Sequence, residues 1–464
     1  MSESSAIIAR MAALDGAGMR ALQLRKLRRL VERLDASSAF YRDLWRKAGV
    51  TPDSIRSLDD LRRLPTIGKA DGLADQNAHP PFGRRLGIDA GEVALVCMTG
   101  GTSGQGQEIY GRSQRDLVMQ GYLHLLPWHI AGLREGDVAL NCVPSGGLTT
   151  GGWGPTEGFR SAGALPLTVG GTMSTDAKID LMCRFSDVAF IYASTNYMHT
   201  LTEAVRRRGI DPRRQFPKMK SIFIAAEGYP VEWAEHIQEF WGATLHEGYG
   251  STQGAGFISS TTEGGVVGPD GSRGVMQCFD WHVIVEVIDP DTGEHVEPGE
   301  YGEVVLTNLD IEGSAVVRFR TGDRVRLLPA GSARNGRDWT CIESGTIGRY
   351  DDMMKIRGNN VWPSAVDLAV FAHEEVAEYV GRVFVDEKAR TEVVVSLGLK
   401  PEFAARDEAF RAGVVARVRA AIKDRTNVQM VVNEVPRDTL PYFENKARRW
   451  TDERPIGYRR GTDV

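Results

Sequence analysis

The spacing of hydrophobic and polar positions changes along the chain. The first eighty residues carry leucines at helical spacing among arginines, and residues 22–34 would form one apolar helix face. Between about residues 133 and 250, short apolar runs alternate with helical stretches such as residues 233–240, which predicts α/β units around a largely parallel sheet. Residues 283–288 and 302–307 alternate apolar and polar positions around turn residues, which predicts antiparallel hairpins.

After about residue 350 the pattern changes to a compact α+β unit with a strand over residues 393–397 and then a helix. At 464 residues, the chain is longer than one hydrophobic core usually organises. We therefore predict an α/β protein with a large N-terminal domain over residues 1–349 and a small α+β domain over residues 350–464. The large domain would combine mostly parallel sheets and helices with a β subdomain at about residues 265–345.

A loop of glycines and hydroxyl residues follows directly on a predicted buried strand, residues 93–98. Its backbone N–H groups could surround phosphate oxygens, because glycine allows the backbone to approach closely. A P-loop NTPase would need Gly-Lys-Ser/Thr and a helix that begins at once. Here residues 107–111 read as a return strand, and Ser113 with Asp116 predicts a later helix start. The loop therefore reads as a strand-to-strand turn.

Charge and cysteine content exclude several classes of protein. The net charge is −5 with both signs interspersed, so no footprint for nucleic acid or for an anionic membrane is present. The five cysteines lie far apart without a C-x-x-C pair, which argues against a disulfide framework and against a thiolate zinc site. The sequence also lacks an apolar run long enough to span a bilayer. We expect a cytoplasmic protein without zinc.

Five separated segments and one lysine together resemble the adenylate-forming (acyl-CoA synthetase-like) superfamily, and within it the phenylacetate–coenzyme A ligase family. The segments are residues 99–107, 225–230, 249–253, 320–323 and 348–358, and the lysine is Lys446. Each segment alone also reads as an ordinary turn or a solvated charge, since short motifs match by chance. It is their order along nearly the whole chain that carries the resemblance.

The resemblance implies an ATP-dependent, AMP-forming ligase. A carboxylic acid, by family an aryl acid, would react with ATP and magnesium to give an acyl adenylate, which a thiol, most often coenzyme A, then attacks. The C-terminal domain would rotate between the two half-reactions about a hinge at Asp351. Two alternatives stay open: an acceptor other than coenzyme A, as in amide-forming ligases or nitrite-using diazotases, and a non-catalytic nucleotide-binding paralogue. A homodimer is common among such relatives.

The resemblance also assigns roles to individual residues. Lys446 would bridge the substrate carboxylate and the α-phosphate as the catalytic residue, and Thr252 would hydrogen-bond the α-phosphate. Asp323 would accept both ribose hydroxyls, with Arg349 assisting. The other implied nucleotide contacts are the phosphate-loop residues Thr99, Gly100, Gly101, Thr102, Ser103 and Gly104, the adenine segment Ala226, Glu227 and Gly228, and the strand residues Tyr249, Gly250 and Ser251.

Two positions depart from the family pattern. Gln105 stands where the loop usually has a lysine, and Gln253 stands where a glutamate usually holds magnesium. Gln253 keeps an oxygen ligand but loses the charge, and magnesium favours carboxylates. On this basis, Gln253→Glu should lower the magnesium requirement. The acid pocket is read by position only and would include Gly151, Trp153, Tyr192 and His246.

Overall fold

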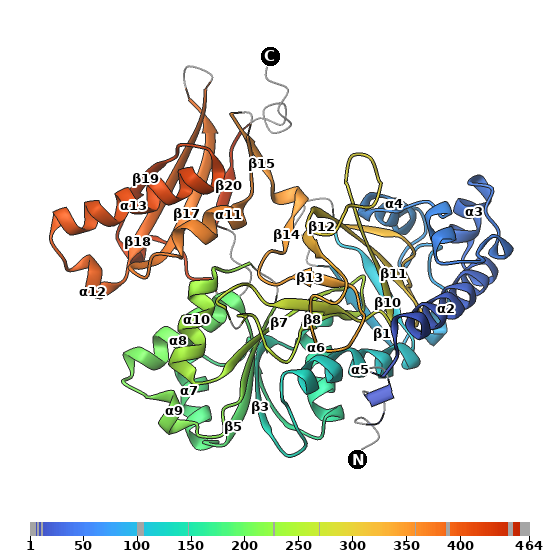
Figure 1. Cartoon of the computed structure of the whole chain (residues 1–464), viewed down its shortest axis with the longest axis horizontal. Coiled ribbons are helices and arrows are strands. Elements are labelled where there is room, and N and C mark those ends of the chain that lie inside the picture. The colour runs from blue at the N-terminus through green and yellow to red at the C-terminus, as the bar shows by residue number, and fades with distance from the viewer. Residues whose placement is uncertain are drawn as a thin grey trace.

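The structure is a computed structural model, and it describes residues 6, 9–10, 13–99, 106–146, 148–225, 228–268, 270–357, 359–386, 390–443 and 449–454. A large domain carries a long mixed sheet with helices, and a smaller unit at the C-terminal end has a sheet of its own (Figure 1). The predicted α/β class is confirmed.

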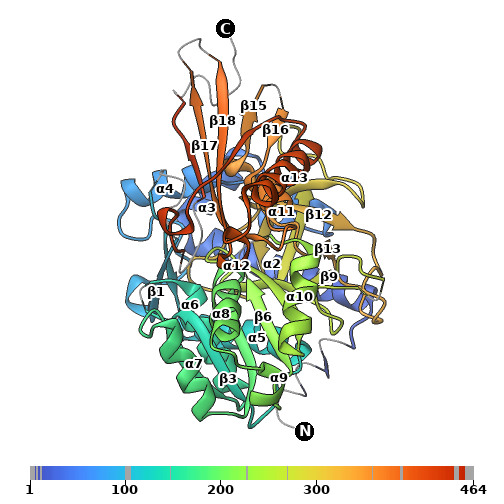
Figure 2. The same ribbon diagram turned by 90° about the vertical axis from the view of Figure 1, so that its left-hand side faces the viewer.

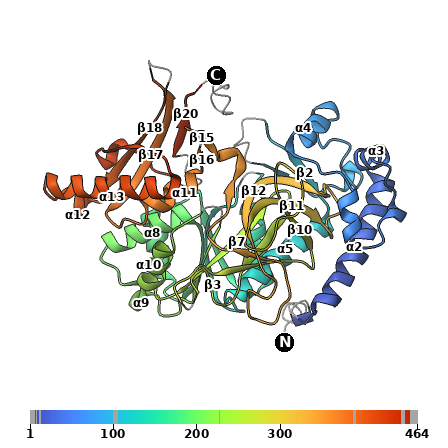
Figure 3. The same ribbon diagram turned by 45° about the horizontal axis from the view of Figure 1, so that its top comes forward.

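Helices dominate the start of the chain, as the leucine spacing predicts. Helix α2 (Gly16–Ser37) begins at Asp15, whose side chain accepts a hydrogen bond from the Gly18 N–H, and α3 (Ala39–Lys47) begins at Ser38 in the same way. The α4 helix (Lys69–Ala78) follows. In Figure 3, α2 and α3 lie at the end of the large domain that is remote from the C-terminal unit.

The main sheet changes from parallel to antiparallel pairing. Its order is β10-β11-β12-β13-β9-β8-β7-β6-β5-β3-β4, with β14 paired to β12. Neighbours from β4 to β7 run parallel, and the pairs from β7 to β10 are antiparallel. The strands are β3 (Val138–Pro144), β4 (Leu165–Gly170), β5 (Val188–Ser194), β6 (Ser221–Ala225), β7 (Thr244–Ser251), β8 (Gly256–Thr261), β9 (Val275–Cys278), β10 (Val283–Ile288), β11 (Tyr301–Asn308), β12 (Phe319–Leu328), β13 (Cys341–Glu343) and β14 (Gly348–Arg349).

Helices pack beside this sheet, and a short hairpin precedes it. The hairpin pairs β1 (Leu95–Met98) with β2 (Ile109–Arg112), which confirms a strand-to-strand connection on either side of the glycine loop. Ser113 and Asp116 form the predicted capping box. The helices are α5 (Gln114–Ile130), α6 (Thr150–Ser161), α7 (Thr175–Arg184), α8 (Thr195–Arg207), α9 (Pro212–Gln215) and α10 (Val231–Trp241).

The C-terminal unit has its own hydrophobic core, built from residues between Met354 and Val432. Its sheet has the order β19-β18-β17-β20, with β15 and β16 as a separate hairpin. Its elements are β15 (Met354–Ile356), β16 (Asn359–Val361), α11 (Pro363–Val370), β17 (Val376–Val385), β18 (Thr391–Leu399), α12 (Pro401–Ala404), α13 (Glu408–Thr426), β19 (Val431–Glu434) and β20 (Trp450–Asp452).

The C-terminal unit lies over the edge of the large domain that carries α8 and α10 (Figures 1 and 2). Two polar contacts join α8 to this unit: the Arg449 guanidinium donates to Asn196, and Lys400 pairs with Glu203 at 3.8 Å. Within the described part of the chain, no helix combines the length and the apolar character that crossing a membrane requires.

Candidate functional site

A buried carboxylate marks one end of the site. Asp323, on β12, is only 8% exposed. The Tyr249 hydroxyl donates to one of its oxygens at 2.6 Å, and the Arg349 guanidinium donates to the other at 2.9 Å. Asp323 and Arg349 are partners in the β12–β14 pairing, so the sheet register brings this ion pair together. Three residues that the sequence assigns to nucleotide binding therefore meet.

The phenol of Tyr249 acts as a donor toward Asp323. Burial, together with the neighbouring Asp323 carboxylate, raises the pKa of Tyr249 well above its ordinary value. The hydroxyl therefore keeps its proton and fixes one carboxylate oxygen of Asp323. Its ring belongs to the core of the large domain.

A tight turn follows Tyr249 at the end of β7. The Ala255 N–H donates to the Thr252 carbonyl at 3.2 Å, and the Gly254 N–H donates to the Ser251 hydroxyl at 3.0 Å. Gly250 is required here, because a Cβ at this position would lie 2.5 Å from the Gly256 carbonyl oxygen. The fully buried Arg112 donates to the Thr252 carbonyl at 2.5 Å and so holds the turn from the β2 side.

The stem of the glycine loop is joined across its two strands. The Thr99 N–H donates to the Glu108 carbonyl at 3.0 Å, and the Glu108 N–H donates to the Thr99 hydroxyl at 3.0 Å. The Thr99 hydroxyl therefore serves the stem as a hydrogen-bond acceptor. Of the predicted phosphate contacts, Gly100, Gly101, Thr102, Ser103 and Gly104 lie outside the described residues.

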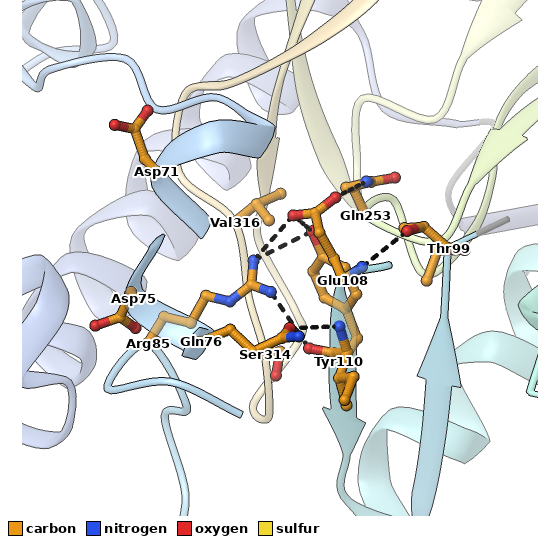
Figure 4. Close-up of polar contacts among 12 residues, drawn as sticks. Asp71, Asp75, Gln76, Arg85, Thr99, Glu108, Tyr110, Gln253, Ser314 and Val316 are labelled. Carbon is orange, nitrogen blue, oxygen red and sulfur yellow. Dashed lines mark hydrogen bonds and ion pairs between the residues drawn. The ribbon is translucent and has the colours of Figure 1, made fainter. Parts of the chain in front are cut away.

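Glu108 is the site residue that sequence reasoning missed. Its side chain is fully buried beside Arg85, and Gln253 donates its amide to Glu108 Oε2 at 2.8 Å (Figure 4). Hydrogen bonds join Asp323 to Tyr249 at one end and Gln253 to Glu108 and the loop stem at the other, and the chain of residues 249–253 connects the two groups. Glu108 and Gln253 are 145 positions apart, so the sequence carries no local signal for their contact.

A third buried carboxylate, Glu247, lies on β7 next to this network. Glu247 accepts hydrogen bonds from the Tyr229 hydroxyl at 2.6 Å and from the Gly345 N–H at 2.7 Å. Burial raises the pKa of the Glu247 carboxyl to about 7. Gly228 lies on the same side, since a Cβ there would be 3.3 Å from the Gly345 carbonyl oxygen. Of the predicted adenine segment, Ala226 and Glu227 lie outside the described residues.

The residues predicted for the acid pocket divide into two groups. Tyr192 and His246 are buried in an aromatic cluster, where the Tyr192 ring lies 5.1 Å from Trp128 and the His246 ring stacks on Phe223 at 6.4 Å. Burial lowers the pKa of His246 to about 4, so this imidazole is neutral at pH 7.

Gly151 and Trp153 are instead less buried residues of α6. A Cβ at Gly151 would meet nothing within 4 Å, whereas Gly154 and Gly158 are needed for packing against His124 on α5. Glycines of this segment therefore serve helix packing, a role that the sequence alone does not separate from ligand contact.

The structure describes the backbone of the proposed hinge but not the proposed catalytic lysine. The backbone of Asp351 belongs to one 3-10 turn, η4 (Tyr350–Asp352), directly after β14. Lys446 lies outside the described residues. Arg449 is described, and its guanidinium binds Glu378 of its own domain and Asn196 of the large domain. Arg449, three positions after Lys446 in sequence, therefore lies at a contact between the C-terminal unit and the large domain.

The oxygen donors of the site suit magnesium only in part. Gln253 can offer one neutral amide oxygen, and no cluster of three or more His, Cys, Asp or Glu side chains suited to a metal occurs among the described residues. Magnesium keeps several waters and binds substrate phosphates readily. One protein oxygen is therefore compatible with a magnesium ion held mainly by phosphates.

The comparisons with known proteins agree on one family. The family described as AMP-binding enzyme matches residues 14–311, and its C-terminal domain matches residues 358–454. The phenylacetate-coenzyme A ligase of Thermus thermophilus is 32% identical over 453 residues, which cover 94% of this chain and 97% of that protein.

Solved structures repeat the fold. A 2-hydroxyisobutyryl-CoA ligase in the postadenylation state, in complex with 2-HIB-AMP, gives a TM-score of 0.86 at 23% identity, covering 96% of this chain and 92% of that one. The same ligase in the thioesterification state, with 2-HIB-AMP and CoA, gives 0.68 at 24% identity, covering 97% and 92%.

Proposed function

Because the chain belongs to the AMP-binding enzyme family, we propose that it activates a carboxylic acid with ATP as an acyl adenylate, releases pyrophosphate and transfers the acyl group to coenzyme A. The observation that supports this most directly is that the turn of residues 249–253 contacts Asp323 through Tyr249 at one end and Glu108, on the stem of the glycine loop, through Gln253 at the other. This arrangement supports a site that combines a candidate ribose acceptor with a candidate phosphate loop.

Charge explains the roles we propose for the individual residues. A carboxylate must approach the α-phosphate of a polyanion, so the site has to supply aligned donors and positive charge. Asp323, paired with Arg349, would accept the ribose hydroxyls. Thr252 would donate to the α-phosphate, and Lys446 would approach the reacting oxygens from the C-terminal domain.

Magnesium would be held by the nucleotide phosphates together with the amide oxygen of Gln253. When bound, the ion neutralises phosphate charge during adenylation. The remaining nucleotide contacts that we propose are the backbone of residues 99–104, Gly228 near the adenine, and the turn that begins at Gly250 and Ser251. Each is carried over by position from the family motif.

An aryl acid is the substrate class that we propose. Support comes from the phenylacetate-coenzyme A ligase similarity and from the aromatic cluster of Tyr192, Trp128, Phe223 and Phe257, to which His246 is added on β7. An aromatic ring gains energy by stacking or edge-to-face contact with such side chains. The neutral His246 adds no charge to this aromatic cluster.

The domain arrangement supports an adenylation-side conformation. The same ligase superposes with a TM-score of 0.86 in its postadenylation state and 0.68 in its thioesterification state. We propose that the C-terminal unit leaves its contacts with α8 and turns about Asp351 before thioester formation. A homodimer and a cytoplasmic location remain proposals from family precedent.

Pyrophosphate exchange tests the proposed function. The protein should catalyse exchange that depends on magnesium, ATP and one or more members of a panel of phenylacetic, benzoic and cinnamic acids, and Asp323→Asn serves as the impaired control. ATP binding without exchange for any acid would favour the non-catalytic paralogue.

Mass spectrometry of parallel reactions with coenzyme A, ammonia or nitrite identifies the acceptor. An acyl-CoA product supports the assignment. An adenylate that persists with coenzyme A but is consumed by an amine or by nitrite contradicts the thioester step and leaves the adenylation step standing.

A further inference from the structure

Glu108 directly follows the glycine loop in sequence, and three donors among the described residues bind its buried carboxylate. The Tyr110 hydroxyl donates to Oε1 at 2.8 Å, Arg85 donates to the same oxygen at 3.3 Å, and the Gln253 amide donates to Oε2 at 2.8 Å (Figure 4). Glu108 and Arg85 are at most 1% exposed, so water does not screen this ion pair. Tyr110 and Arg85 therefore occupy Oε1, and Gln253 is the donor at Oε2.

The Glu108 carboxylate fixes the orientation of the Gln253 amide. The Gln253 NH₂ group is the donor to Glu108 Oε2, so the NH₂ end of the amide faces Glu108. The amide oxygen then points away from Glu108 and Arg85, as Figure 4 shows. Gln253 directly follows Thr252, so this oxygen belongs to the turn that the nucleotide would contact.

We propose that Glu108 is a positioning residue, which holds the Gln253 amide with its oxygen directed to the magnesium nucleotide. This inference rests on the proposed function for the identity of the ligand, but the coupling between the two side chains does not. The pair contains one carboxylate and one amide, and the carboxylate sits on the loop stem instead of the turn.

The arrangement reverses the expectation for Gln253→Glu. In the variant, two carboxylates would face each other at hydrogen-bond distance, with the Arg85 guanidinium at the other oxygen of Glu108, and like charges so close cannot both ionise at low cost. The added charge would therefore destabilise the site instead of improving the metal ligand. Exchanging the two groups, as in Glu108→Gln with Gln253→Glu, restores one carboxylate and one amide.

Thermal unfolding of the nucleotide-free protein measures the coupling. Gln253→Glu should lower the midpoint by several degrees, whereas the exchanged double variant should recover most of the loss. Gln429→Glu is the matched control, because Gln429 is exposed in the C-terminal unit and the substitution adds the same charge. An unchanged midpoint for Gln253→Glu, or additive losses in the double variant, would overturn the proposal.

Calorimetry with ATP, with and without magnesium, measures the role in ligand binding. Gln253→Glu should weaken binding in magnesium roughly tenfold, about the value of one hydrogen bond to a charged group. The double variant should bind within a few-fold of the unsubstituted protein, and the loss should shrink without magnesium. Equal losses with and without magnesium would remove the metal from the proposal.

These measurements are separate from the test of the proposed function. A protein that activates no acid but shows the coupling keeps the Glu108–Gln253 inference and loses the ligase assignment. If the double variant does not accumulate as folded protein, the comparison of Gln253→Glu with Gln429→Glu decides, and a Gln253→Glu variant as stable as its control contradicts the proposal.

Discussion

The Tyr249 hydroxyl lies 2.6 Å from Asp323 Oδ2, on the side of the carboxylate opposite Arg349. The two donors fix the orientation of the Asp323 carboxylate before a ligand binds. Such preorganisation lowers the cost of binding a diol.

Asp323→Asn should weaken ATP binding on the order of ten- to a hundredfold, because the charged acceptor that would face the ribose is lost. Calorimetric titration with ATP measures the effect. Asp291→Asn, on an exposed turn, is the control and should bind ATP like the unsubstituted protein. Equal affinities for the two variants would remove Asp323 from the nucleotide site.

Lys446→Ala should slow acid-dependent pyrophosphate exchange on the order of a hundredfold or more, about the value of one oriented charge in a site that excludes water. ATP affinity should change less than the exchange rate. Lys423→Ala, an exposed lysine of the same domain, is the control. An unchanged exchange rate would show that another group stabilises the transferring carboxylate.

Asp351→Pro should leave pyrophosphate exchange nearly intact and abolish thioester formation. Proline fixes φ at the centre of the η4 turn and so hinders rotation of the C-terminal domain. Asp351→Ala should retain both half-reactions. Parallel exchange and acyl-CoA assays decide, and loss of both activities in the proline variant would point to misfolding of the turn.

Asn196→Ala should reduce adenylation more than thioester formation, since its amide oxygen accepts from Arg449 in the arrangement described here. An interface contact present in one conformation favours the half-reaction of that conformation. Single-turnover rates for the two steps, with exposed Asn360→Ala as the control, measure the ratio. A ratio that does not move contradicts a role for this contact in selecting the conformation.

Glu247→Gln should change the dependence of stability on pH. Burial places the pKa of Glu247 at about 7 in the folded protein, against an ordinary value of 4.5. The folded state therefore binds this proton more tightly, and the stability that the proton contributes is present below pH 4.5 and lost as pH rises through 7. At about 1.4 kcal/mol for each pKa unit, the shift from 4.5 to about 7 corresponds to a loss of about 3.5 kcal/mol.

Unfolding midpoints at pH 5 and pH 8 check this sign. The difference between Glu247→Gln and the unsubstituted protein should shift in favour of the variant at pH 8. Glu297→Gln, at an exposed position, should show no such shift. A difference that is the same at both pH values would mean that Glu247 does not titrate in this range.

Periodicity and turn chemistry predict the fold well here, because the signals are local. Ser113 and Asp116 cap α5 as their spacing indicates, and the change from parallel to antiparallel strands follows the change in hydrophobic pattern. What the pattern does not contain is the merging of both strand types into one continuous sheet. Strand pairing across long separations depends on packing, which leaves no local mark.

The candidate site also divides into residues that carry a sequence signal and residues that do not. Asp323, Arg349 and Tyr249 carry family motifs, and the structure brings them together. Glu108 carries no motif, and its meaning depends on Gln253, which is distant in sequence. The sequence alone therefore suggests that a glutamate at position 253 would help magnesium binding, whereas from the buried Glu108 we infer the opposite effect.

The short β14 strand ends at Arg349, and the η4 turn begins at the next residue. Arg349, which pairs with Asp323, is thus the last residue before the turn that contains the proposed hinge, Asp351. A nucleotide bound at Asp323 would fix the residues before this hinge, while the residues after it stay able to turn. Release of AMP should then loosen the attachment of the whole C-terminal domain, so that small-angle scattering of the empty enzyme gives a larger radius of gyration than that of the adenylate complex.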